Sequence, residues 1–244
     1  MKLDISELAS AFPEFRVAAL VATGMRLPAE RPEDLGDLIA AREAAVRRAW
    51  GGRELGAIPG INAWRLAYKA FGIKKTKYRC SVERLVKNAL AGRPLPAING
   101  FVDAYNAVSM THVLPIGADD LDKVLGDLAF RYAQPGDTFV DMSGADEAAE
   151  SDGEASDNAP KPGEVIFADG AGKALCRRWN WRQDARSLVS SETTRAVMTI
   201  QSLGVGELDA AIADAMALIE RFSAGRVSVT VLDVKTPTAE LAGT

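Results

Sequence analysis

The stretch ADGAGKALCRRWNWR, residues 168–182, organises the rest of the chain. It reads as an apolar strand, a glycine turn and a tetrapeptide with two tryptophans. On an extended backbone, Trp179 and Trp181 share one face, while Arg178, Asn180 and Arg182 share the other. The polar face offers fixed donors for a carboxylate, a phosphate or a nucleotide edge. The alternative is an ordinary strand with buried rings and solvated charges, and the spacing leaves both interpretations open.

Composition predicts a globular protein with an ample core, because 48% of the 244 residues are apolar. The net charge of −4 does not represent most of the chain, because six of the 33 acids fall within residues 145–161. Without that segment, 27 acids face 28 bases, so the rest of the chain is close to neutral. This balance leaves an RNA partner open, and we expect no DNA partner.

Cys80 and Cys176 lack the spacing of a metal or redox motif, so we expect no metal and no cofactor. The sequence has no signal peptide and no apolar run near 18 residues. We therefore expect no membrane association and a cytoplasmic location.

Hydrophobic periodicity predicts strands interleaved with helices, which is typical of a mixed α/β or α+β single domain over 1–244. Residues 1–77 form a helical and strand extension in this interpretation. Residues 143–163, rich in Ala, Ser, Asp and Glu, form a flexible insertion. Ser81 is the expected N-cap of a helix over 82–91, and Asn99 caps the next helix. The expected strands are 2–5, 15–21, 113–116, 128–132, 164–168, 173–176, 196–203 and 226–234, and the other expected helices are 32–50, 59–71, 119–125 and 208–222.

A basic segment lies between residues 65 and 93, interrupted only by Glu83 as an acid. Tyr68 and Tyr78 accompany it, so rings are available to stack on bases. The predicted RNA-binding residues are Lys74, Lys75, Lys77 and Arg79. A solvated helix face is the alternative interpretation of the same charges.

Three motifs stand out in the middle of the chain. They are Val102-Asp103-Ala104-Tyr105-Asn106, Pro115 with Asp120-Leu121-Asp122-Lys123, and residues 165–169 with Ala174-Leu175 and Thr193. These motifs resemble the B3/B4 domain, the editing module of the bacterial phenylalanyl-tRNA synthetase beta subunit. The resemblance covers residues 78–203 and implies an α+β fold of mixed sheets with packed helices. It also implies substrate-binding roles for Asn106 and Thr193.

The chain departs from the family at both residues associated with hydrolysis. Gly117 aligns with the family's histidine, and Asn180-Trp181-Arg182 replaces a Gly-Gly-Glu that carries the pocket glutamate. This predicts a remodelled pocket in which Arg178, Asn180, Trp181 and Arg182 hold an anion, with Arg182 as its anchor. Glu164, Asp169 and the sole histidine, His112, are the candidates for a catalytic base, and a structural role for His112 is the alternative.

Three hypotheses follow from the sequence. The first is an RNA-linked module that binds tRNA or aminoacyl-tRNA, with hydrolysis of a mischarged ester left open. The second is a binding protein for a free amino acid or a related anion without RNA contact. The third is an interaction domain with an inert pocket. The lack of a class II catalytic core argues against a complete tRNA ligase.

Overall fold

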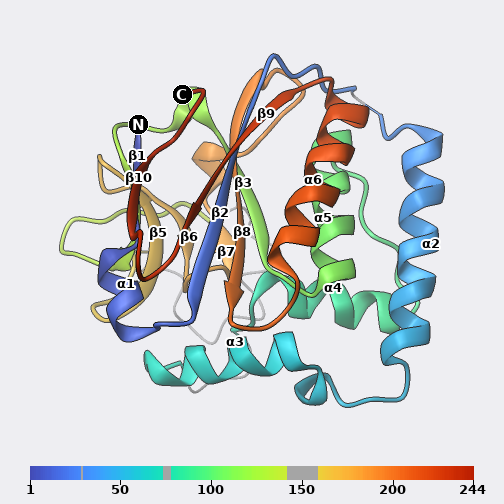
Figure 1. Ribbon diagram of the computed structural model, residues 1–244, viewed down its shortest axis with the longest axis horizontal. Helices are drawn as coiled ribbons and strands as arrows, with labels where there is room; N and C mark the ends of the chain where they lie inside the picture. The colour runs from blue at the N-terminus through green and yellow to red at the C-terminus, as the bar shows by residue number, and fades with distance from the viewer. Residues whose placement is uncertain (29, 74–77, 142–158) are drawn as a thin grey trace.

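The computed structural model describes residues 1–28, 30–73, 78–141 and 159–244, and its strands form two sheets (Figure 1). Sheet A has six strands in the order β10-β1-β4-β5-β6-β7. Its β1–β4 pair is parallel and its other pairs are antiparallel, so the sheet is mixed. The strands are β1 (Lys2–Asp4), β4 (Leu128–Tyr132), β5 (Val165–Asp169), β6 (Ala174–Arg177), β7 (Arg182–Gln183) and β10 (Thr238–Glu240).

Sheet B has four antiparallel strands in the order β3-β8-β2-β9. Its strands are β2 (Phe15–Thr23), β3 (Ile116–Asp120), β8 (Arg195–Leu203) and β9 (Arg226–Leu232). The central pair, β2 and β8, is apolar on both faces over most of its length, as expected for strands that are covered on both sides. The first 23 residues therefore supply one strand to each sheet.

Sheet B lies between sheet A and a layer of helices (Figure 1). Helices α5 and α6 pack against it, and α2 packs outside α5. The α+β fold class with mixed sheets and packed helices is thus confirmed. The helices are α1 (Ser6–Ala11), α2 (Glu33–Trp50), α3 (Pro59–Ala70), α4 (Ser81–Leu90), α5 (Gly100–His112) and α6 (Leu208–Ser223).

Of the two N-caps predicted from the sequence, one is confirmed and one is wrong. The Asn99 side chain accepts a hydrogen bond from the backbone N–H of Val102, which confirms it as the cap of α5. Helix α4, however, begins at Ser81 and not after it, with Cys80 as the cap residue. The Ser81 hydroxyl is buried and has no hydrogen-bond partner among the described residues, so it does not cap α4.

The strand predicted across residues 178–181 is wrong, because the chain turns there. Strand β6 ends at Arg177 and β7 begins at Arg182. Between them Arg178 and Trp179 have φ angles of 46° and 68°, a left-handed conformation that interrupts the alternation of faces. The turn places the Trp179 ring in the core, where its edge-to-face partners are Phe12, Phe15 and Trp64.

Two other boundaries also differ from the prediction. The strand expected at 113–116 is displaced to Ile116–Asp120, because Val113 ends α5 in the left-handed conformation and the strand starts later. The helix expected at 119–125 shrinks to the single turn η2 (Leu121–Lys123). The predicted insertion at 143–163 lies outside the described residues except for 159–163.

Candidate functional site between the two sheets

A row of buried polar side chains lies on the face of sheet B that looks toward sheet A. The Tyr68 hydroxyl donates to Asn180 Oδ1 at 2.9 Å, and Asn180 Nδ2 donates to Gln201 Oε1 at 3.1 Å. Gln201 Nε2 in turn donates a hydrogen bond to Thr199 Oγ1 at 3.2 Å. Because buried polar groups need partners, this row fixes the orientation of the Asn180 and Gln201 amides.

Asp119 lies on the same face, one strand away on β3. Its register partner is Val197, two residues before Thr199 on β8. The Ser187 hydroxyl and Gln183 Nε2 both donate to its Oδ1, at 2.6 and 3.0 Å. Burial, opposed by these two hydrogen bonds, raises the pKa of Asp119 to about 7. A carboxyl that titrates near neutrality can accept or release a proton at physiological pH.

Gly117 lies two residues before Asp119, so it shares the face of Asp119 and pairs with Thr199. A Cβ built on Gly117 meets no atom of the described residues within 4 Å. The Cys176 thiol also lies near this carboxylate, and burial followed by the charge of Asp119 raises its pKa. The region thus combines a titratable carboxyl with an open position beside it.

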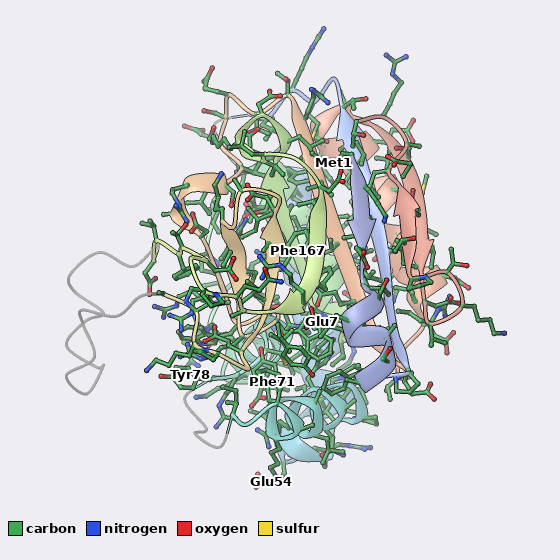
Figure 2. The ribbon with its side chains drawn as sticks, turned by 90° about the vertical axis from the view of Figure 1, so that its left-hand side faces the viewer. Met1, Glu7, Glu54, Phe71, Tyr78 and Phe167 are labelled. Carbon is green, nitrogen blue, oxygen red and sulfur yellow. The ribbon has the colours of Figure 1, made fainter. Side chains whose placement is uncertain are left out.

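The Arg178 guanidinium lies in a corner formed by two rings. Its Cζ is 3.6 Å from the Tyr78 ring centroid and 4.4 Å from that of Trp181. The two rings themselves meet at 4.9 Å and 84°. Figure 2 shows Tyr78 at the outer edge of the end of the molecule that carries α3. Burial lowers the pKa of Arg178, and the charge of Glu164 opposes this effect.

Arg182, the predicted anion anchor, instead has a carboxylate of its own chain. Its Nη1 lies 2.6 Å from Asp141 Oδ2, and its guanidinium also contacts the Trp181 ring. Asn180 takes part in the inter-sheet row, and Trp181 separates the two arginines. Arg178 differs from Arg182 in this respect, because no carboxylate of the described residues forms an ion pair with it.

A comparison of the sequence with known protein families finds a match that includes the region just described. The family model of the B3/4 domain matches residues 63–205, which is more than half of the chain. The chain belongs to the B3/4 domain family. The match includes β3 to β8 and therefore Gly117, Asp119 and the turn at 178–181.

A solved structure is also similar to this B3/4 chain. It is an N-terminal fragment of the phenylalanyl-tRNA synthetase beta subunit from Pyrococcus horikoshii, with 12% sequence identity and a TM-score of 0.43. The alignment covers 92% of this chain and 49% of that fragment, so the chain spans about half the length of its relative. No curated protein matches the sequence.

The three candidate bases of this B3/4 domain all have partners within the chain. Arg177 donates two hydrogen bonds of 2.8 Å to Glu164. Burial alone would raise the pKa of Glu164, but the hydrogen bonds and the charge of Arg177 outweigh burial and lower it. Asp169 accepts the backbone N–H groups of Leu125, Ala171 and Lys173, which closes the β5–β6 turn. His112 Nε2 lies 3.1 Å from Asp214 Oδ2 in the helix layer.

The residues assigned from the family resemblance lie apart from the inter-sheet row. Thr193 Oγ1 donates to Asp120 Oδ2 at 2.7 Å and accepts from the backbone N–H of Ser190, so it orders its own loop. Asn106 lies on α5 and is half-buried. Among the described residues, no hydrogen bond joins Asn106 or Thr193 to Asn180 or Arg178.

Part of the predicted basic surface is neutralised by a buried acid. Arg65 Nη2 lies 2.6 Å from Glu83 Oε1, and Arg79 pairs with the same carboxylate. Lys74, Lys75 and Lys77 lie outside the described residues. Lys69, Arg84 and Lys87 are exposed on α3 and α4, so the described basic surface is smaller than the sequence suggests.

Sequence analysis missed Asp119 because it placed residues 119–125 in a helix. The signal that was available is the alternation of Gly117 and Asp119, which puts both on one face once the strand is extended to residue 120. Among the described residues, no group of three or more His, Cys, Asp or Glu side chains is arranged to hold a metal ion. No described helix is both long and apolar enough to cross a bilayer.

Proposed function

We propose that this B3/4 domain binds the aminoacyl end of tRNA and hydrolyses the ester of a mischarged amino acid, with Asp119 as general base. The observation that carries the proposal is the Asp119 carboxyl, with a pKa of about 7, beside the open position at Gly117. Family membership and the exposed bases on α3 and α4 support the RNA partner.

In the proposed step, the Asp119 carboxylate takes a proton from water as the water oxygen bonds to the ester carbonyl carbon. The bond from that carbon to the ribose oxygen then breaks, and the proton passes from Asp119 to this oxygen, which leaves as a hydroxyl. Ser187 and Gln183 both donate to Oδ1. These two donors would hold the carboxylate in place during the transfer.

Deacylation of mischarged aminoacyl-tRNA tests this role. The rate is expected to rise with pH through about 7, since only ionised Asp119 accepts the proton. Asp119→Asn should lower the rate by about 100-fold, within the range for loss of a general base. Asp122→Asn is the matched control, because this neighbouring carboxylate is largely exposed and lies on η2, outside β3. A flat pH profile with an unchanged rate in Asp119→Asn would rule the mechanism out.

Retention of total tRNA on filters at two salt concentrations tests the RNA partner. Phosphate contacts release counterions, so affinity must fall steeply as salt rises. Changing Lys74, Lys75 and Lys77 together to Glu should abolish retention and leave the melting temperature nearly unchanged. The control reverses three exposed charges, Arg26, Arg226 and Lys235, and should still bind tRNA. Equal retention by the two triple variants would assign the lysines to an ordinary solvated surface.

A second function is favoured by the amide row of Asn180 and Gln201. These amides and Asp119 suit the ammonium and carboxylate groups of a free amino acid, with no RNA contact. Calorimetric titration with free amino acids separates the two functions. Binding of an amino acid by a protein that retains no tRNA at low salt would favour the second.

A further inference from the structure

The turn at 178–181 holds an arginine whose guanidinium is buried. Arg177 is paired with Glu164 and Arg182 with Asp141, whereas no ion pair is formed by Arg178 within the described chain. Arg178 is nevertheless only 6% exposed. The charge of Glu164 acts on this guanidinium, but the Glu164 carboxylate is already held by Arg177. A buried charge without an ion-pair partner of its own is costly, and a bound anion would offset that cost.

Two rings keep water from part of this guanidinium. Tyr78 and Trp181 stand nearly perpendicular to each other, and both contact Arg178. Attraction between the cation and the ring faces holds the guanidinium in the corner but supplies no hydrogen-bond acceptor. The Arg178 nitrogens therefore keep their capacity to donate to a ligand.

Three buried donors in the same neighbourhood have no acceptor. They are Arg178 Nε, Trp181 Nε1 and Ser81 Oγ, each without a hydrogen-bond partner in the described structure. The two segments that carry them adjoin, since the Ser81 N–H donates to the Asn180 carbonyl at 2.9 Å and Tyr78 contacts Trp181. Buried donors cost free energy until an acceptor reaches them. A group that accepts several hydrogen bonds and carries negative charge satisfies all these requirements.

We propose that Ser81, Arg178 and Trp181 form a binding site for an oxyanion, a phosphate or a carboxylate group, in the corner made by Tyr78. The site goes beyond the proposed hydrolysis and does not depend on it, because neither Asp119 nor tRNA takes part. An oxyanion accepts from the planar guanidinium through two oxygens, which a lysine ammonium cannot reproduce.

Binding of small anions to the whole chain tests the site. Inorganic phosphate, AMP and acetate are titrated at constant ionic strength, with chloride as the balancing ion, while tryptophan fluorescence and the melting temperature are recorded. The wild type should bind at least one of these anions saturably and melt at a higher temperature in its presence. A response to phosphate and AMP indicates a phosphate-bearing ligand, and a response to acetate indicates a carboxylate.

Variants identify the residue responsible. Arg178→Met should weaken binding at least tenfold, and Arg178→Lys should weaken it severalfold because the charge remains but the paired donors do not. Arg53→Met is the matched control, since Arg53 is an exposed arginine over another tryptophan, Trp50. If Arg178→Met does not fold, Trp181→Phe keeps a ring, removes one donor and should also weaken binding. No response to any of the three anions, or equal affinity in the wild type and these variants, would overturn the proposal.

Discussion

Trp179 and Trp181 are two residues apart and have different surroundings. Trp179 is fully buried, in edge-to-face contact with Phe12, Phe15 and Trp64. Trp181 is half-buried and contacts Tyr78 and two arginines. The first therefore contributes to the core, and the second shapes the surface around Arg178.

Truncating the two tryptophans should separate these roles. Trp179→Ala is expected to lower the free energy of unfolding by about 3 to 5 kcal/mol, the range for removal of a large buried ring. Trp181→Ala should cost less than half as much, because solvent already reaches part of its ring. Urea denaturation measures both changes. Similar losses would mean that Trp181 also supports the core.

For single residues, the sequence predicted which positions are important but not which side chains surround them. It singled out residues 178–182, which hold buried donors without a hydrogen-bond partner among the described residues, and it predicted the Asn99 cap. It assumed an extended backbone, whereas Arg178 and Trp179 adopt left-handed angles that ordinary residues rarely take. Burial of the Trp179 ring favours this turn, and the aromatic partners that provide the burial are distant in sequence, so no local pattern indicates it.

At the scale of the element, β3 combines the titratable Asp119 with the open position at Gly117. Within the described residues, the strand lies at the edge of sheet B and its one neighbour is β8. Its start follows the left-handed end of α5 at Val113, so helix and strand are joined by a short connection. The periodicity of helices such as α2 and α6 was visible in the sequence. A five-residue strand that ends in two aspartates was not, because acids are uncommon in strands.

Substitution of glycines tests whether the position at Gly117 is open. Gly117→Ala should leave the free energy of unfolding unchanged or raise it by up to about 1 kcal/mol, because the new methyl group meets no atom. Gly60→Ala is the contrast, since its Cβ would lie 2.7 Å from the Val113 carbonyl oxygen. Thermal melting should show a loss of about 1 to 3 kcal/mol for that change. A loss of the same size at Gly117 would show that the position is filled.

At the scale of the whole molecule, one carboxylate connects three helices. Asp214 on α6 accepts two hydrogen bonds of 2.6 Å from Arg42 on α2 and lies 3.1 Å from His112 on α5. Burial alone would raise its pKa, but the hydrogen bonds with His112 and Arg42 outweigh burial and lower it to about 2. The sole histidine therefore lies in a structural contact of the helix layer.

Acid unfolding should reveal this connection. Since the pKa of Asp214 falls from about 4 in the unfolded chain to about 2, its ionised form stabilises the fold above about pH 4. The contribution, about 2 kcal/mol, is lost as pH falls toward 2. Wild type and Asp214→Asn should thus differ in unfolding free energy at pH 7 and converge near pH 2. A difference that does not depend on pH would contradict this assignment.

At the same scale, the sequence predicted the fold class through the interleaving of strands and helices and through the family resemblance. The arrangement of two sheets was not predictable, because β1 pairs with β10 and β2 with β8 across most of the chain. Such pairings depend on long-range burial, which a local window of sequence does not contain. The Asp119 site lies where these two sheets face each other. Its position could therefore not be predicted without knowing how the sheets are arranged.

The two thiols give the molecule an intrinsic chemical probe of local opening. Burial raises the pKa of Cys80 to about 12, and burial also raises that of Cys176, so little of either is the reactive thiolate at neutral pH. Modification by a thiol reagent must then follow transient exposure of the sulfur. Cys80 precedes α4 beside the Arg178 corner, and Cys176 lies near Asp119. The two labelling rates therefore report separately how often each region opens, without any change to the sequence.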